Sequence, residues 1–173
     1  LPDDLARART APFEIDTKTL ARLEPLVRAY LMLHQHLASD ELAATKRTFG
    51  DVRKAAAAAT ITAPQRAAER WKYLREKIRS AAEEGHEANG LDEARVSFEP
   101  VSVAIIELIR RYGNPADEPV RLAFCPMAND NEGAQWVQTA ERIENPYFGS
   151  EMYRCGELRA TAEPEGRLPA PER

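Results

Sequence analysis

The stretch LDEARVSFEPVSVAIIELIRRY, residues 91–112, carries apolar side chains at alternating steps of three and four residues. This spacing places apolar residues along one face of an α-helix. Pro100 lies inside the stretch, so we expect a kink or a short break after Phe98. A Gly-Asn-Pro sequence at residues 113–115 predicts a firm end to the helix. The apolar positions are Leu91, Ala94, Phe98, Val101, Ile105, Leu108 and Tyr112.

Three earlier segments repeat this helical pattern. The first begins at Thr17 and continues to Leu37. The second follows a cap at Ser39 or Asp40, and the third covers residues 64–90. Four amphipathic segments joined by short connections predict an up-down four-helix bundle, so the fold class is mainly α.

After Pro119 the pattern changes from helical to extended. Residues 120–124 alternate between apolar side chains and Arg or Ala, which predicts a strand leading into Cys125. A turn cluster at residues 129–133 separates this strand from a second short strand at residues 134–137. We therefore expect a compact C-terminal loop region with a short β-hairpin.

The chain of 173 residues fits one domain with tails. Residues 1–16 are predicted to form a flexible N-terminal arm, because they carry few large apolar groups and no clear period. Residues 17–156 form the single helical-bundle domain, with the Cys/Met loop region at residues 120–156. Residues 157–173 are polar and proline-rich, and are predicted to be a disordered tail.

Composition argues against several classes of function. The net charge is only −4 with 30% charged residues, so no broad basic surface favours nucleic acid or an anionic membrane. No stretch approaches the roughly 18 consecutive apolar residues of a membrane span. We also find no HExxH, GxSxG or phosphate-loop pattern, so we do not expect an enzyme.

Both cysteines of the chain lie close to a methionine. Cys125 and Met127 are two residues apart, a spacing that points both side chains to the same side of an extended segment. Met152 and Cys155 are three residues apart, a spacing that places both side chains on one face of a helical turn. Thiolate and thioether form a soft ligand set that suits copper(I). The alternative is a Cys125–Cys155 disulfide that closes a loop of about 30 residues and stabilises it by about 3 to 4 kcal/mol.

His34 and Trp136 each have two alternative roles near such a site. His34 lies in the apolar stripe of the first helix, where it is either a hydrogen-bonded packing residue or a further metal ligand. With Cys125 and Cys155 it would give a zinc site as the alternative metal. Trp136 either packs beside the turns or covers the metal.

The loop region also resembles a known family. CPMANDNEGAQWVQ at residues 125–138, ERIENPYFG at 141–149 and MYRCGEL at 152–158 resemble the signature of a bacterial domain of unknown function. That domain is found alone or fused to periplasmic adaptor (membrane fusion) subunits of heavy-metal efflux pumps, including the copper/silver type. The resemblance implies a periplasmic or otherwise exported location, and periplasmic efflux or metallochaperone proteins as partners.

The resemblance also assigns residues. It implies that the metal ligands are Cys125, Met127, Met152 and Cys155. It further implies that the loop is shaped by Asn145, Pro146, Tyr147 and Gly149. The leading hypothesis is thus a copper(I)-binding module. The alternative is a disulfide-stapled interaction module without metal, with Tyr147, Phe148 and Tyr153 as exposed contacts.

Overall fold

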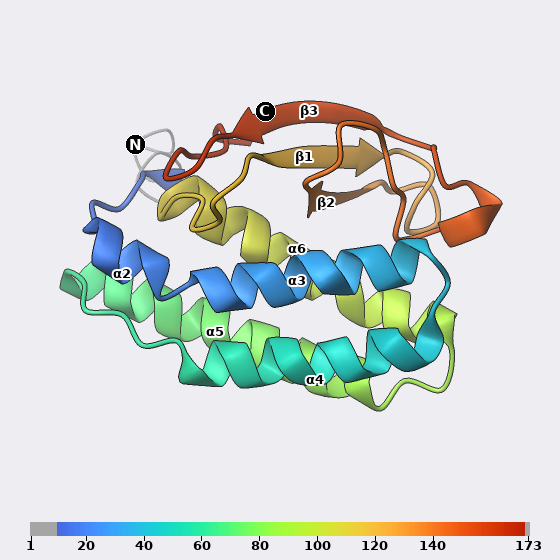
Figure 1. The fold of residues 1–173 in the computed structure, drawn as a ribbon, viewed down its shortest axis with the longest axis horizontal. Helices are drawn as coiled ribbons and strands as arrows, with labels where there is room; N and C mark the ends of the chain where they lie inside the picture. The colour runs from blue at the N-terminus through green and yellow to red at the C-terminus, as the bar shows by residue number, and fades with distance from the viewer. Residues whose placement is uncertain (1–9, 172–173) are drawn as a thin grey trace.

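The computed structural model describes residues 10–171 and shows a helical bundle covered on one side by a small sheet (Figure 1). The sheet lies over α3 and α6, whereas α4 and α5 form the opposite side of the bundle. The predicted mainly α fold, with four long helices and a small C-terminal sheet, is confirmed. No helix within residues 10–171 is long and apolar enough to cross a membrane. The helices are α2 (Thr17–Ala21), α3 (Glu24–Ala38), α4 (Leu42–Ala58), α5 (Gln65–His86) and α6 (Leu91–Arg111).

Helix α6 is the central element of the fold, because it contacts α5 on one side and the sheet on the other. Its predicted apolar stripe is buried from Ala94 to Leu108. The helix runs unbroken through Pro100, so a break after Phe98 does not occur. Pro100 lies on the exposed side of α6, where water can reach the backbone carbonyl that loses its helical donor.

The first predicted helix is divided in two. Asp16 caps α2 by accepting a hydrogen bond from the Thr19 backbone N–H at 2.7 Å. A short turn then leads into α3, in whose first turn Pro25 lies. Pro25 has no backbone N–H to donate, and the first turn of a helix is where none is required.

The sheet has three antiparallel strands in the order β2-β1-β3. Strands β1 (Val120–Cys125) and β2 (Ala134–Gln138) form the predicted hairpin. Strand β3 (Glu157–Ala162) pairs with the other edge of β1, so the prediction of a disordered tail from residue 157 was wrong. Polar and apolar residues alternate along β3, and most of the strand is exposed at the edge of the sheet. Its backbone nevertheless satisfies the hydrogen-bonding groups of β1.

The N-terminal arm is docked where the structure describes it. Residues 1–9 of the predicted flexible arm lie outside the described residues. Phe13 donates its backbone N–H to the Arg111 carbonyl at 2.7 Å, and its ring lies 5.1 Å from that of Tyr112. The Arg111 guanidinium stacks on the Phe13 ring at 4.0 Å. Phe13 thus fixes this segment to the end of α6.

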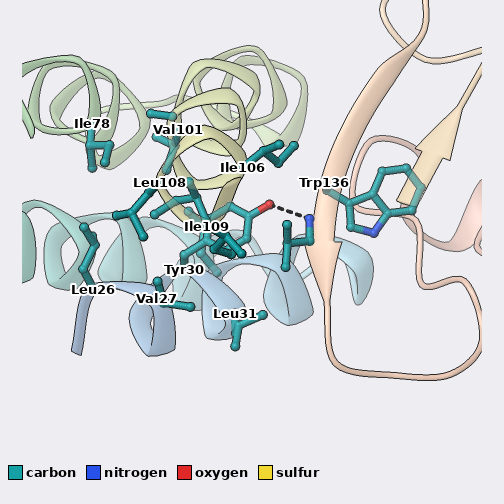
Figure 2. Close-up of a cluster of buried hydrophobic side chains, with 14 of the residues drawn as sticks. Leu26, Val27, Tyr30, Leu31, Ile78, Val101, Ile106, Leu108, Ile109 and Trp136 are labelled. Carbon is teal, nitrogen blue, oxygen red and sulfur yellow. Dashed lines mark hydrogen bonds between the residues drawn. The ribbon is translucent and has the colours of Figure 1, made fainter. Parts of the chain in front are cut away.

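Tyr30 joins the bundle to the sheet (Figure 2). Its hydroxyl accepts a hydrogen bond from the Val137 backbone N–H at 3.0 Å and is also hydrogen-bonded to the Ser102 hydroxyl. The Tyr30 ring stacks on Phe98 at 5.4 Å. Complete burial raises the pKa of Tyr30, so the phenol stays neutral and hydrogen-bonded at the joint.

Candidate functional site

The two cysteines meet at the end of the sheet. Cys125 is the last residue of β1, and Cys155 lies in the loop of residues 139–156 between β2 and β3, which we call the thiol loop. The Sγ atoms are 3.1 Å apart, and both residues are free thiols. Cys125 is fully buried, whereas Cys155 is partly exposed. The hydrogen bond with Cys125, followed by burial, raises the pKa of the Cys155 thiol.

Asn145 fixes the backbone around Cys155. Its side-chain amide donates to the Cys155 carbonyl at 2.8 Å. Its side-chain oxygen accepts from the backbone N–H groups of Tyr147 at 2.8 Å and Phe148 at 3.1 Å. Asn145 has no exposed surface, so these bonds replace all contact of the side chain with water. These three hydrogen bonds join the backbone at Tyr147 and Phe148 to the backbone at Cys155.

His34 holds the thiol loop from the other side. Its Nε2 atom lies 2.7 Å from the Glu144 carbonyl oxygen, so Nε2 carries the proton and donates it. Burial lowers the pKa of His34 to about 4, and the ring is therefore neutral at pH 7. This is the hydrogen-bonded packing role, and Nε2 has no free lone pair for a metal.

His34 does not join the cysteines in a three-residue site. Within residues 10–171, no group of three or more His, Cys, Asp or Glu side chains is placed to hold a metal ion. The zinc set of Cys125, Cys155 and His34 is therefore not assembled in this structure. Of these three residues, the structure brings together only the two cysteines.

Gly149 lies where a side chain has no room. Its φ is +56°, and a Cβ atom there would clash with Asp40 Oδ1. The Asp40 carboxylate accepts from the Ser150 backbone N–H at 2.9 Å and from Arg95 Nη2 at 2.6 Å. These hydrogen bonds, with that of Ser150 foremost, hold the pKa of Asp40 below its usual value. Glycine at residue 149 thus allows the close approach of the loop to Asp40.

The predicted cap at Ser39 or Asp40 was wrong. Glu41 is the N-cap residue of α4, and its side chain makes no capping bond. Asp40 instead has a φ of 57°, and its carboxylate is turned toward the thiol loop. Arg95 completes this contact by donating Nε to the Pro146 carbonyl at 2.9 Å. Arg95 gave no signal in the sequence, because a single arginine on a helix normally indicates a solvated face.

The aromatic residues of the loop pack against the core. The Tyr147 ring lies 5.5 Å from Phe98 and 6.0 Å from Trp136, and its hydroxyl donates to the Gln135 carbonyl at 3.1 Å. Trp136 is fully buried and donates Nε1–H to Gln138 Oε1 at 2.9 Å. Phe148 is also partly buried against the core. Tyr147 is therefore not an exposed contact residue, and Trp136 has the packing role.

The methionines lie apart from the buried thiol. Met127 and Met152 line one open groove of about 470 Å³ together with Phe148 and one face of α6, and neither cysteine lines it. Met127 is 47% exposed, although Cys125 is buried. The expectation that Cys125 and Met127 point to one side was wrong, because β1 ends at Cys125 and a turn begins at the next residue. Met152 and Cys155 share the predicted turn, in which the Cys155 N–H donates to the Met152 carbonyl at 3.0 Å.

Comparison with known proteins identifies the helical part of the chain. Residues 26–117 match the model of a family described as "Protein of unknown function (DUF3347)". The matched segment covers more than half of the 173 residues, from α3 through α6, and ends before β1. No curated protein and no solved structure matches the chain. The chain therefore belongs to the DUF3347 family of proteins of unknown function.

Proposed function

We propose that the reduced domain binds copper(I) through the thiolates of Cys125 and Cys155. The observation that carries this proposal is the 3.1 Å separation of the two Sγ atoms. Two sulfur ligands on one ion, at bond lengths of about 2.3 Å, are roughly 3.7 to 4.6 Å apart. The sulfurs must therefore separate by about 1 Å. This movement falls on the partly exposed Cys155, because Cys125 is fixed in the core.

The donor set favours copper(I) over zinc. Structural zinc sites take four ligands, and catalytic zinc sites take three protein ligands. Two thiolates are a soft donor set of low coordination number, which suits copper(I). From the resemblance of residues 125–158 to the efflux-associated domain, we further propose a periplasmic role in copper handling, resistance or efflux. The partners would then be periplasmic efflux or metallochaperone proteins.

A copper(I) titration tests this proposal. Reduced protein should compete with a chromogenic copper(I) chelator at one ion per chain. Cys155→Ser should abolish that competition, because one thiolate is removed from a partly exposed position with little effect on packing. Met32→Leu is the matched control, since Met32 is exposed on α3 and lines a different groove. No competition by the reduced wild-type protein would overturn the proposal.

The same distance favours a second candidate, a Cys125–Cys155 disulfide that braces the thiol loop without a metal. A disulfide needs the sulfurs at about 2.05 Å. The Cys155 thiolate would attack a disulfide-bearing oxidant to give a mixed disulfide and one released thiol. The Cys125 thiolate would then displace the second thiol, so two protons and two electrons leave the pair. Mass spectrometry after thiol alkylation distinguishes this state, because a chain isolated wholly as the disulfide carries no alkyl group.

A further inference from the structure

We infer that the groove between α6 and the loop region is a second soft-cation site, in which the thioethers of Met127 and Met152 are the ligands. The inference rests on the proposed function for the choice of ion, but uses different atoms. The groove has one wall from α6, formed by Asp92, Val96 and Glu99. The two methionines also line the groove, one from the turn after β1 and one from the thiol loop.

The two thioethers are accessible to an incoming ion. Met127 is 47% exposed and Met152 is partly exposed, and neither belongs to the buried core. Segments about 25 residues apart in the chain thus bring two soft, neutral ligands to one groove. The third methionine, Met32, is exposed to a similar degree, but among the described residues its groove contains no second methionine.

The charges around the groove attract cations. Asp92, Glu99 and Asp130 line it, and the one cationic side chain there, Arg95, is held by Asp40 at 2.6 Å. A cleft with an excess of one sign of charge raises the local concentration of ions of the opposite sign. Burial, and then the charge of Glu132, raises the pKa of Glu99. A bound cation would lower that pKa again by stabilising the carboxylate.

The groove lies next to the thiol pair along the chain. Met152 accepts the backbone N–H of Cys155 at 3.0 Å, and Met127 follows Cys125 by two residues. A thioether binds a metal without losing a proton, whereas each thiol must lose one. The methionine site should therefore keep its affinity at a pH where the thiols are protonated.

The experiment uses the full chain with Cys125→Ser and Cys155→Ser, labelled with ¹³C at the methionine methyl groups. Silver(I) is added, because it is a soft monovalent ion that does not change its redox state. Each methionine gives one signal, assigned with single Leu variants. We expect the Met127 and Met152 signals to shift together and to saturate at one ion per chain, at pH 5 as well as at pH 7. Met127→Leu should weaken binding by roughly tenfold or more, while Met32→Leu should leave it unchanged.

Two results would overturn the inference. One is the absence of a saturable shift at Met127 and Met152, and the other is an equal shift of all three methionines, which indicates unspecific thioether binding. If the double serine variant does not fold, the wild-type chain with its cysteines oxidised to the disulfide takes its place under the same criteria. A separate measurement tests the proposed function. That proposal fails if reduced wild-type protein binds copper(I) no more tightly than the variant without thiols.

Discussion

The bundle and the thiol loop are held by different forces. In α3 to α6, apolar side chains along each helix are buried against one another, so the stabilising free energy is distributed over many contacts. The thiol loop has little regular structure and is held by a few polar groups, chiefly the buried Asn145 and His34 and the partly buried Asp40–Arg95 pair. Loss of one such group leaves buried donors or acceptors unpaired. Single substitutions should therefore disrupt the loop while the bundle stays folded.

The largest effect is expected where the two regions meet. Phe98→Ala removes a fully buried ring that contacts both Tyr30 and Tyr147, and should lower the free energy of unfolding by about 3 to 5 kcal/mol. Urea denaturation followed by fluorescence checks this result, because Trp71 reports on α5 and Trp136 on β2. With either tryptophan replaced by Phe in turn, both probes should show the same loss. A loss seen by only one probe would mean that the regions unfold separately.

A loop substitution should affect only one region. Asn145→Ala leaves the Cys155 carbonyl and two backbone N–H groups unpaired, at a cost of up to about 3 kcal/mol to the local structure. We expect alkylation of Cys155 to become more than about tenfold faster, because local opening governs access to the thiol. The thermal unfolding of the helices, followed by circular dichroism, should change little.

Asn89→Ala is the control for this variant, since Asn89 is exposed before α6 and its side chain makes only a 3.1 Å contact with Glu93. It should alter neither measurement. If Asn145→Ala lowers helix stability by the same amount as it loosens Cys155, the two regions form one cooperative unit.

The loop should also weaken in acid. The pKa of His34 is about 4 in the folded chain and about 6.5 when unfolded, so the unfolded chain binds more protons between these values. His34 makes its full contribution to the free energy of unfolding above pH 6.5. This contribution is lost as the pH falls from 6.5 through 4. Between pH 7 and pH 5 we expect a loss of about 2 kcal/mol.

Urea denaturation at the two pH values measures this difference. His34→Gln should reduce it, because glutamine does not titrate. His36→Gln should retain it, because His36 is hydrogen-bonded to Glu41 near the surface. An equal pH dependence in wild type and His34→Gln would show that another group carries the effect.

The contrast between the regions also explains what the sequence could predict. The stripe from Ala94 to Leu108 is buried as predicted. Helical periodicity can be predicted because it is a pattern among residues only three or four positions apart. The end of β1 at Cys125 also followed from local alternation and the turn cluster after it. The role of Cys125 and Cys155, which lie together in the structure, was left open between a metal site and a disulfide. A spacing of 30 residues in the sequence cannot decide between the two.

Contacts between distant polar residues could not be predicted. His34 and Glu144 are 110 residues apart, and Asp40 and Arg95 are 55 apart, and neither pair belongs to a periodic pattern. Strand β3 was missed because the prediction relied on the overall composition of residues 157–173, although polar and apolar residues alternate along the strand itself. Local pattern therefore encodes the bundle, whereas the loop depends on individual long-range hydrogen bonds that carry no signal in one sequence.

Tyr147 gives the smallest effect, although it combines both kinds of contact. Tyr147→Phe removes the hydrogen bond to the Gln135 carbonyl but keeps the ring against Phe98 and Trp136, so we expect a loss of about 1 kcal/mol. Alkylation of Cys155 should accelerate far less than in Asn145→Ala, because the backbone bonds around Cys155 remain. Tyr73→Phe, at an exposed position on α5, is the control. If Tyr147→Phe releases Cys155 as fully as Asn145→Ala does, the tyrosine hydroxyl, and not the Asn145 amide, is the main attachment of the loop.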